Sequence, residues 1–433
     1  MWDWGVLDLS AATAKMCCMT TPDLQEGIDE DAFENGIFHS PQLREARRKM
    51  LVGERPSACS GCWKMEDAGN QEISPRRTVQ SLKDYWSQEI NGDLIEESSF
   101  PGKVVTLQGM SAVTAQGDLR FTAVRKLQRI QLILSSTCNL KCWYCNENNS
   151  SYWEQYKRKQ GQLPSDFKER KVNPRLLQKS MSWLARRMED GLEELNVSGG
   201  EPALCKEFYE LAEFLKEAKP FAPRLTMDVL SNLGFREREK EKFFSTLMEL
   251  SEIFPVCLSV SMDAFGRRAE FIRDPLDWSR WDRHFREWLA LSRTNDRVQT
   301  RVRTTFSALN LHGLKEFYRY LFEASQSAQA GFEVVDNIVV EPSHLSPYAV
   351  PASFSECLTE PIRYLQESAG NLTFFSPEQK VLWGERTVSF LEDLAQGLSR
   401  GQKPEVDSSL KVFLQRAFAA DGSLREVFRE FDS

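Results

Sequence analysis

Between residues 129 and 342 the chain alternates six times between a strand-like and a helix-like segment. Six short apolar runs are typical of buried strands, namely "RIQLILSS", "LEELNVSGG", "RLTMDVLSN", "FPVCLSVSMD", "VQTRVRTTFS" and "FEVVDNIVVEP". Longer segments with apolar residues at helical spacing separate them, as in Leu177, Met181, Leu184 and Met188 after Pro174. Because parallel neighbouring strands need a crossover connection, this order predicts an α/β fold with a parallel sheet. The pattern leaves open whether the sheet closes.

The segments on either side of this core have a different character. Residues 1–100 contain four cysteines and little strand–helix alternation, and a polar stretch follows. After residue 342 the pattern is mostly helical, with "SSLKVFLQRAFAA" as one amphipathic candidate. We therefore predict an N-terminal domain over 1–100, a linker over 101–128, a core over 129–342 and a helical C-terminal extension over 343–433.

Composition and charge narrow the possible partners and the cellular compartment. The net charge of −8 argues against nucleic-acid binding through an overall positive charge. No run approaches the roughly 18 apolar residues of a membrane span, so no membrane partner is expected. The first residues, "MWDWGVLDLS", lack the pattern of a secretory signal. We expect a cytoplasmic protein, in which clustered cysteines hold metal more often than they form disulfides.

Three cysteines crowd into the stretch "SSTCNLKCWYCNENNSSYW", directly after the first core strand. Cys138, Cys142 and Cys145 have the spacing Cys-x3-Cys-x2-Cys. Cysteine thiolates are the usual protein ligands of iron–sulfur clusters. A structural zinc site would need a fourth ligand, and none is nearby in the sequence. The loop can therefore hold three irons of a 4Fe-4S cluster and leave the fourth iron open to another molecule.

This spacing, with the aromatic residue Tyr144 before the last cysteine, resembles the signature of the radical S-adenosylmethionine (radical SAM) enzymes. The resemblance implies a (β/α)6 partial TIM barrel in which the cysteine loop follows the first strand. It implies that Cys138, Cys142 and Cys145 are the catalytic cluster ligands and that the open iron binds S-adenosylmethionine (SAM). Reductive cleavage of SAM would then yield a 5′-deoxyadenosyl radical. On this reading Tyr144 covers the cluster or the adenine.

Three later stretches resemble further motifs of the same family, each at the end of a predicted strand. The resemblance assigns SAM binding to "SGGEP", which follows the second strand, and to Asn232 in "LSNLG", which follows the third. In "SVSMDAFGRRAEFIRDP" it places Ser261 and Asp263 near the ribose or carboxylate, and Arg273 at the SAM carboxylate. Within "SGGEP", the residues that the resemblance assigns to SAM binding are Gly199, Gly200, Glu201 and Pro202.

The cysteines of the N-terminal region suggest a second metal site. Cys59 and Cys62, in "VGERPSACSGCWKMEDAG", resemble the auxiliary-cluster modules of the SPASM and twitch subfamilies. The resemblance implies an auxiliary iron–sulfur cluster in which one of Cys17 and Cys18 joins them. We favour Cys18, because successive side chains of an extended chain point to opposite sides. Cys17 is then either the fourth ligand or a spectator, and a structural zinc knuckle is the alternative.

The substrate and the partners follow only from this resemblance. Enzymes with such modules often modify ribosomally made peptides, so a peptide is the leading substrate class and a sugar or cyclitol the alternative. A flavodoxin or ferredoxin would supply the electron. A different class altogether is a non-catalytic iron–sulfur or zinc protein that serves as a scaffold or redox sensor. We expect Cys205 and Cys257 to be packing residues. We expect the same of Cys357, with hydrogen-atom donation as its alternative role.

Overall fold

The computed structural model describes most of the chain from residue 128 onward and shorter pieces before it. The described residues are 4–15, 26–29, 32–35, 37, 45–46, 49, 54–60, 63, 67, 128–217, 225–401 and 405–431. Of the four cysteines predicted to hold an auxiliary cluster, Cys17, Cys18 and Cys62 lie outside these residues.

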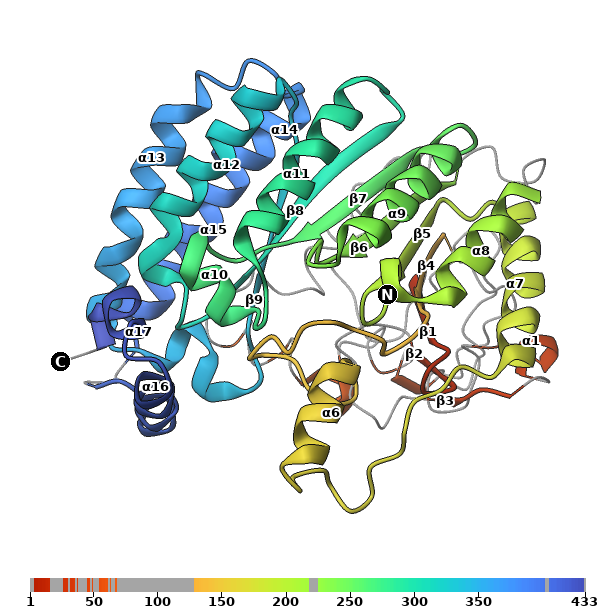
Figure 1. Ribbon diagram of the computed structural model, residues 1–433, viewed down its shortest axis with the longest axis horizontal. Coiled ribbons are helices and arrows are strands. Elements are labelled where there is room, and N and C mark those ends of the chain that lie inside the picture. The colour runs from red at the N-terminus through yellow and green to blue at the C-terminus, as the bar shows by residue number, and fades with distance from the viewer. Residues whose placement is uncertain are drawn as a thin grey trace, which may run out of the picture.

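The six predicted core strands form six neighbouring parallel strands of one sheet, in chain order (Figure 1). Their bounds are β4 Arg129–Ile133, β5 Glu194–Ser198, β6 Thr226–Ser231, β7 Val256–Ser261, β8 Val298–Phe306 and β9 Glu333–Ile338. The prediction of an α/β fold with a parallel sheet is therefore confirmed. The carboxyl ends of all six strands lie on the same side of the sheet, which is where the active sites of α/β barrels are found.

Three N-terminal strands, which sequence reasoning did not anticipate, extend this sheet beyond β4. The strand β1 (Trp4–Asp8) pairs in parallel with β4, and β2 (Thr13–Lys15) and β3 (Glu26–Gly27) follow in antiparallel order. They belong to the region that we assigned to an N-terminal domain, and the boundary at residue 100 stays a prediction. Among the described strands β3 and β9 are the two edges, so the sheet does not close on itself.

Helices cover one face of the sheet and continue into the C-terminal region (Figure 1). Those of the core are α6 Ser151–Lys159, α7 Pro174–Glu189, α8 Lys206–Glu217, α9 Glu237–Ser251, α10 Gly266–Ile272, α11 Trp278–Arg293 and α12 Leu314–Ala328. The C-terminal helices are α13 Thr359–Ala369, α14 Pro377–Val381, α15 Thr387–Ser399, α16 Ser408–Ala420 and α17 Leu424–Val427, and a short α1 (Ala32–Asn35) precedes the core. The expected helical C-terminal region is thus confirmed.

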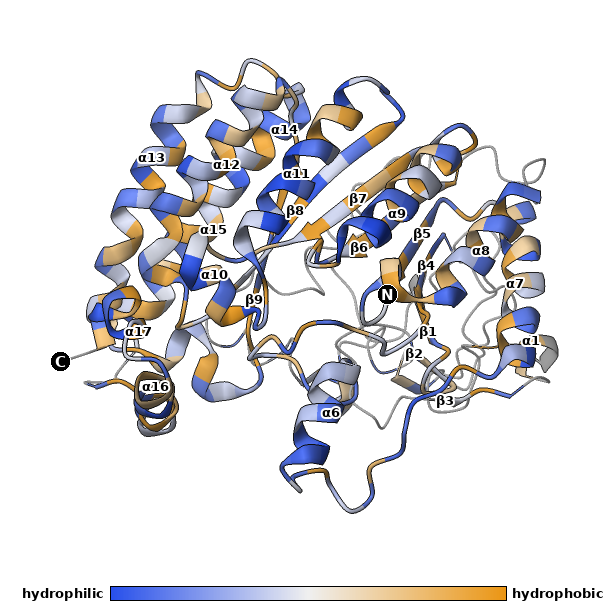
Figure 2. Ribbon diagram, viewed as in Figure 1, coloured by the Kyte–Doolittle hydropathy of each residue, from blue (hydrophilic) through white to orange (hydrophobic). Residues whose placement is uncertain are grey.

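The apolar core lies between the sheet and these helices. Apolar and polar residues alternate around each helix (Figure 2). The first five residues of β7 are all buried. In β8 the residues Val298, Val302 and Phe306 are buried, and the intervening Arg301 and Arg303 point to the opposite, polar face of the sheet. Three tryptophans are among the largest fully buried side chains, namely Trp281, Trp288 and Trp383. Within the described residues, no helix is both long and apolar enough to cross a membrane.

Short turns of 3-10 or π-helix join these elements. They are η2 Ser57–Cys59, η3 Pro202–Leu204, η5 Leu311–Gly313, η6 Ser343–Leu345, η7 Pro347–Ala349, η8 Ala352–Leu358, η9 Leu382–Arg386 and η10 Arg429–Phe431. The end of the chain is fastened to the core by a buried ion pair. Nη1 of Arg268, in α10, lies 2.7 Å from Oε1 of Glu430.

Candidate active site

The three-cysteine loop leaves the carboxyl end of β4 and runs into α6. The first turn of α6 holds the loop in shape. Oγ of Ser150 caps the helix by accepting from the N–H of Trp153 at 3.3 Å. The N–H of Cys138 donates to Oγ of Ser151 at 3.1 Å, and the indole N–H of Trp153 donates to the carbonyl oxygen of Cys142 at 2.9 Å. Hydrogen bonds to the first turn of α6 therefore stabilise the loop backbone.

The three loop thiols are partly buried and lie near one another. Burial raises the pKa of each, that of Cys142 to about 12, and the nearby Cys145 thiol adds to the effect. In the described part of the chain no three His, Cys, Asp or Glu side chains converge closely enough to hold a single metal ion. A 4Fe-4S cluster binds one thiolate at each of its irons, so its ligands need not converge on one point. The loop thus offers three separate thiol positions, as a polynuclear cluster requires.

Two polar side chains point at the sulfurs, one directly after β6 and one at the end of α10. Nδ2 of Asn232 lies 3.7 Å from Sγ of Cys138, and Nη1 of Arg273 lies 3.9 Å from Sγ of Cys142. The positive charge of Arg273 opposes the effect of burial on the pKa of Cys142. Donors of this kind favour thiolate and tune the potential of a bound cluster. The donor set thus suits anionic sulfur ligands.

The two glycines after β5 pack directly on the backbone that leads into the cysteine loop. A Cβ on Gly199 would lie 2.5 Å from the carbonyl oxygen of Ser135, and one on Gly200 would lie 2.1 Å from that of Thr137. The N–H of Gly200 donates to the oxygen of Ser135, and the N–H of Glu201 donates to that of Thr137, both at 2.6 Å. Glycine is required here because two backbones approach each other too closely for any side chain.

Glu201 is fully buried and hydrogen-bonded within the protein. Its carboxylate accepts from the N–H of Asn232 at 2.7 Å, from the hydroxyl of Ser231 at 2.9 Å and from the N–H of Ala203 at 3.2 Å. Burial raises the pKa of Glu201 to about 7, and these three donors oppose the rise. Glu201 therefore joins the end of β5 to the end of β6. The buried Pro202 opens the short helix η3 that follows.

The turn after β6 is locked to the cysteine loop by a pair of asparagines. Nδ2 of Asn232 donates to Oδ1 of Asn139 at 3.0 Å, and Nδ2 of Asn139 donates to the carbonyl oxygen of Gly234 at 2.9 Å. Oδ1 of Asn232 accepts from the N–H of Gly234 at 2.7 Å. Sequence reasoning missed Asn139, whose only signal was its place directly after Cys138.

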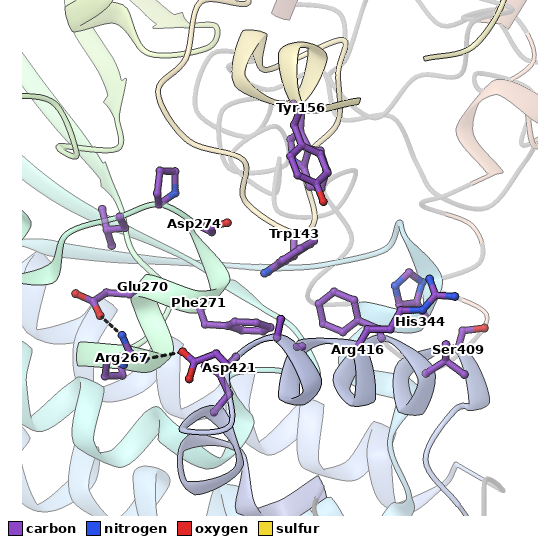
Figure 3. A pocket seen from close by; sticks show the side chains of 18 of the residues that line it. Trp143, Tyr156, Arg267, Glu270, Phe271, Asp274, His344, Ser409, Arg416 and Asp421 are labelled. Atoms are coloured by element: carbon purple, nitrogen blue, oxygen red, sulfur yellow. Dashed lines mark hydrogen bonds and ion pairs between the residues drawn. The ribbon is translucent and has the colours of Figure 1, made fainter. Parts of the chain in front are cut away.

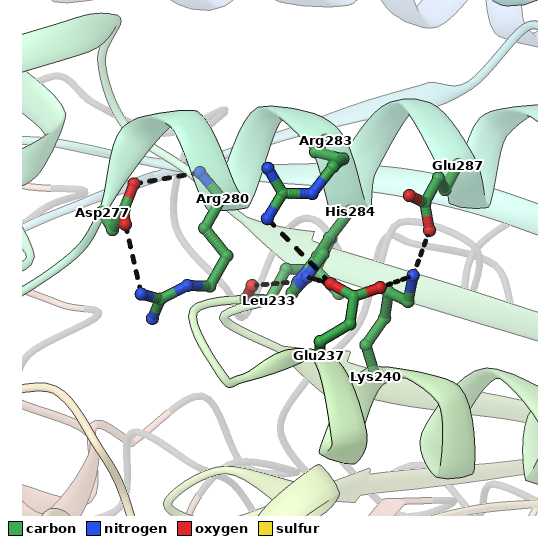
Figure 4. Close-up of polar contacts among 8 residues, drawn as sticks. All are labelled: Leu233, Glu237, Lys240, Asp277, Arg280, Arg283, His284 and Glu287. Carbon is green, nitrogen blue, oxygen red and sulfur yellow. Dashed lines mark hydrogen bonds and ion pairs between the residues drawn. The ribbon is translucent and has the colours of Figure 1, made fainter.

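A buried histidine supports the same turn from the helical side. Nδ1 of His284, in α11, lies 3.1 Å from the carbonyl oxygen of Leu233, which has a left-handed backbone with φ of 51°. Nε2 of His284 lies 3.3 Å from Oε2 of Glu237 in α9 (Figure 4). Lys240 joins Glu237 to Glu287 and so links α9 and α11. Burial lowers the pKa of His284, and the contacts with Leu233 and Glu237 oppose this shift.

Asp263 and Arg273 form a buried ion pair against the cysteine loop. Asp263 is 1% exposed and Arg273 is 5% exposed. Nε of Arg273 lies 2.8 Å from Oδ2 of Asp263, and Nη2 donates to Oδ1 at 3.0 Å. The hydroxyl of Tyr144 donates to Oδ2 of Asp263, and the N–H of Thr305 donates to Oδ1 at 2.9 Å. The structure thus unites Tyr144, Asp263 and Arg273 in one network beside Cys142.

A second polar network lies on the polar face of the sheet, around the buried Asp228 in β6. Asp228 accepts from Ser259 at 2.6 Å, from Arg303 at 2.8 Å, from Arg301 at 2.9 Å and from Asn196 at 3.0 Å. Ser261, which ends β7 and is half-buried, is the register partner of Arg303. Sequence reasoning missed this network, although the alternating polar residues of "VQTRVRTTFS" were a signal for it.

The other cysteines that the structure describes are Cys59, Cys205, Cys257 and Cys357. Cys59 is buried at the end of η2. Cys205 and Cys257 are 2% exposed, in agreement with the expected packing role. The half-buried Cys357 lies in η8, near the Arg268–Glu430 ion pair.

Comparison with known proteins gives one family match. Residues 132–302 match the model of the Radical SAM superfamily. The chain is 25% identical over 118 residues to GTP 3',8-cyclase from Nautilia profundicola, a match that covers 27% of this chain and 31% of that protein. The chain therefore spans less than a third of this curated relative.

Solved structures of Streptococcus suis SuiB are more remote. The structure with bound S-adenosylmethionine matches with a TM-score of 0.37 at 13% identity, over 55% of this chain and 48% of that chain. The structure with the precursor peptide SuiA matches with a TM-score of 0.34 at 12% identity, over 78% of this chain and 62% of that chain. TM-scores this low support no argument about function.

Proposed function

Because the chain carries a radical SAM superfamily domain over residues 132–302, we propose that it is an enzyme that cleaves S-adenosylmethionine reductively and abstracts hydrogen from a substrate. The observation that carries the proposal is the three-cysteine loop at the carboxyl end of β4, with Asn232 and Arg273 each aimed at one sulfur. Cys138, Cys142 and Cys145 would be the ligands of the 4Fe-4S cluster. When bound, this cluster supplies the electron that converts SAM to methionine and a 5′-deoxyadenosyl radical.

The chain's own residues hold the loop and its charges in place. Asp263 fixes the guanidinium of Arg273 with two contacts, so that Nη1 stays beside the sulfur of Cys142. Tyr144 covers this ion pair from the loop side. The guanidinium of Arg273 lowers the pKa of the Cys142 thiol and so favours its thiolate form, whereas the carboxylate of Asp263 has the opposite, smaller effect. Together these contacts preorganise the loop for an anionic cluster.

For SAM we propose one residue of the cysteine loop together with residues that follow β5, β6, β7 and α10. The proposed contacts are Tyr144, Gly199, Gly200, Glu201, Pro202, Asn232, Ser261, Asp263 and Arg273. Nη1 and Nη2 of Arg273 each make one of the hydrogen bonds described above, so each retains one further N–H group. The oxygen Oε2 of Glu201 accepts one hydrogen bond and retains a second lone pair. These spare positions are what a carboxylate and an ammonium group of the ligand would use.

A ribosomally made peptide is our proposed substrate. The N-terminal cysteine pattern supports it through its resemblance to SPASM and twitch modules. We further propose that Cys59, Cys62 and Cys18 hold an auxiliary iron–sulfur cluster, with Cys17 as the fourth ligand or a spectator. A small-molecule substrate is the second candidate, and the match to a GTP 3',8-cyclase favours it. A flavodoxin or ferredoxin in the cytoplasm is the proposed electron donor.

The test is anaerobic reconstitution with iron and sulfide, followed by dithionite and SAM. We expect 5′-deoxyadenosine from the wild-type chain and none from Cys142→Ala. Cys257→Ala is the matched control, because it removes a buried thiol outside the loop and should keep the activity. Equal activity in Cys142→Ala would show that Cys142 is not a required cluster ligand. No activity in any reconstituted protein would exclude the proposed reaction and leave a scaffold or sensor role.

Substrate class is tested by deuterium transfer. A deuterated precursor peptide and deuterated small molecules are each supplied with SAM and dithionite. Deuterium in the 5′-deoxyadenosine identifies the substrate from which hydrogen was taken. Transfer only from a small molecule would reject the peptide.

A further inference from the structure

The helix α10 brings Arg273 to the cysteine loop. Arg273 caps the carboxyl end of α10, between Ile272 and Asp274. The N–H of Trp143 donates to the carbonyl oxygen of Ile272 at 3.0 Å. The N–H of Lys141 donates to the carbonyl oxygen of Asp274 at 2.7 Å. Because the loop backbone binds the residues on both sides of Arg273, the position of α10 sets the position of this guanidinium beside the loop.

The opposite end of α10 is bound by a C-terminal segment, residues 408–431, which contains α16, α17 and η10. Nη1 of Arg268, near the start of α10, lies 2.7 Å from Oε1 of Glu430, and Nη2 donates to the carbonyl oxygen of Val427. The guanidinium also lies over the ring of Phe428, 4.4 Å from its centroid. The side chains of Arg268 and Glu430 are 11% and 7% exposed, so solvent screens their attraction only weakly.

A second ion pair between α10 and the C-terminal segment lies at the surface. Nη2 of Arg267 lies 3.0 Å from Oδ2 of Asp421, and Nη1 lies 3.6 Å from Oε2 of Glu270 (Figure 3). The side chains of Arg267 and Asp421 are both exposed, and exposed ion pairs contribute little to stability. The buried pair of Arg268 and Glu430 is therefore the stronger ionic link between α10 and the segment.

Aromatic rings pack α10 between the C-terminal segment and the cysteine loop. The ring centroid of Phe271 lies 5.0 Å from that of Phe428 and 6.0 Å from that of Phe413. On the loop side it lies 5.8 Å from the centroid of Trp143, and both rings line the pocket drawn in Figure 3. A displacement of the C-terminal segment would therefore reach the loop through α10.

Arg268 also supports Asp263, the ionic partner of Arg273. Nη1 of Arg268 donates to the carbonyl oxygen of Leu309 at 2.6 Å. The next residue, Asn310, is fully buried, and its Nδ2 donates to the carbonyl oxygen of Asp263 at 2.9 Å. Arg268 thus contacts the segments that position both members of the Asp263–Arg273 pair.

The buried pair of Arg268 and Glu430 provides direction more than stability. A buried ion pair often stabilises a fold no more than apolar side chains of the same size would. Its hydrogen bonds are directional, however, and the planar guanidinium of Arg268 donates to one carboxylate and two carbonyl oxygens at once. A side chain held in this way fixes the orientation of the helix that carries it.

We propose that Arg268 and Glu430 are positioning residues for SAM. Together they hold α10 so that the guanidinium of Arg273 stays beside the cysteine loop, where it binds the SAM carboxylate. The inference rests on the proposed function, because it requires Arg273 to be a SAM contact. It assigns to the C-terminal segment a part in SAM affinity, although no residue of that segment touches the ligand.

The test compares Glu430→Gln with the wild type, each as the reconstituted full chain. Anaerobic calorimetry measures the Kd for SAM, and 5′-deoxyadenosine formation with dithionite gives KM and kcat. We expect the Kd and the KM for SAM to rise roughly tenfold and kcat to stay within about twofold, because a contact made equally in the ground state and the transition state is weakened. Glu430→Asp keeps the charge and should recover part of the affinity.

Two control variants separate positioning from a general loss of stability. Glu426→Gln removes the same charge from an exposed position of α17. Leu184→Ala removes a buried side chain from α7, which lies at the other end of the sheet from α10 (Figure 1). Leu184→Ala should lower the free energy of unfolding, and both variants should bind SAM as the wild type does.

A double variant shows whether the effect passes through Arg273. In an Arg273→Gln background, Glu430→Gln should weaken SAM binding no further. Additive losses, a wild-type Kd in Glu430→Gln, or an equal rise of the Kd in Leu184→Ala would each overturn the positioning role. If the wild type forms no 5′-deoxyadenosine with dithionite, the proposed function itself fails, so the two failures are distinguishable.

Discussion

Gly200→Ala should break the contact between the strand ends and the cysteine loop. The added Cβ would lie 2.1 Å from the oxygen and 2.4 Å from the carbon of the Thr137 carbonyl, and 2.7 Å from the carbon of Ser136. Since an ordinary carbon contact is about 3.5 Å or more, the two backbones must separate by roughly 1 Å. All three clashing atoms belong to the backbone, so no side-chain rotation relieves them. The displaced residue Thr137 directly precedes Cys138.

The magnitude follows from the contacts that this separation disrupts. Overpacking costs about 1–3 kcal/mol. Each of the two 2.6 Å hydrogen bonds, from Gly200 to Ser135 and from Glu201 to Thr137, contributes about 1 kcal/mol. We therefore expect a loss of about 3–5 kcal/mol in the free energy of unfolding. Cluster loading should fall as well, because the clash displaces the first ligand of the loop.

Urea unfolding of the metal-free protein measures the first effect, and iron per chain after reconstitution measures the second. Gly370→Ala is the control, since its Cβ would meet nothing within 4 Å and its φ of −67° suits any residue. We expect that variant to stay within about 1 kcal/mol of the wild type. Wild-type stability and iron content in Gly200→Ala would refute the reasoning, because the close approach would then not hold the loop.

Three further predictions concern charge and metal content. Asp263→Asn leaves Arg273 buried beside an uncharged partner, so the free energy of unfolding should fall by about 3 kcal/mol. The midpoint potential of the cluster should also shift, which a redox titration measures. An unchanged potential would mean that the ion pair does not act on the cluster. Burial raises the pKa of Asp336 from its usual 3.8 to about 7, so the folded state binds this proton more tightly and stability should fall as pH rises from about 4 to about 7. In Asp336→Asn this pH-dependent loss, at most about 4 kcal/mol in the free energy of unfolding, should vanish. Urea titrations at several pH values measure it, and the same pH dependence in the variant and the wild type would contradict the assignment. A variant with all three loop cysteines changed to alanine should keep the iron of the auxiliary cluster, and a protein without iron would show that the N-terminal site is absent or holds zinc.

The sequence predicted the six core strands because each is a short apolar run between longer periodic segments. It missed β2 and β3 because these strands are only three and two residues long, and it missed β1 although β1 is as long as β4. The partner of β1 is β4, more than a hundred residues further along the chain, and no local pattern reports such a pairing. Propensity describes neighbours in sequence, whereas sheet membership depends on neighbours in space.

The location of the candidate site was predictable for a similar reason. Parallel strands end at one edge, so motifs that follow successive strands must meet there. The hydrogen-bond and ion-pair partners of each side chain were not predictable. Glu201 binds the end of β6, and Arg273 binds Asp263 and Cys142. Asn139 and His284 support the site without any signature in the sequence.

The central claim is that three loop cysteines anchor a cluster whose remaining iron binds SAM. Its most direct test is electron–nuclear double resonance on the reduced, reconstituted protein with SAM labelled by nitrogen-15 at the amino group. The account predicts a hyperfine coupling between that nitrogen and the cluster, absent in Cys142→Ala. A reduced wild-type cluster with no coupling to the label would contradict it.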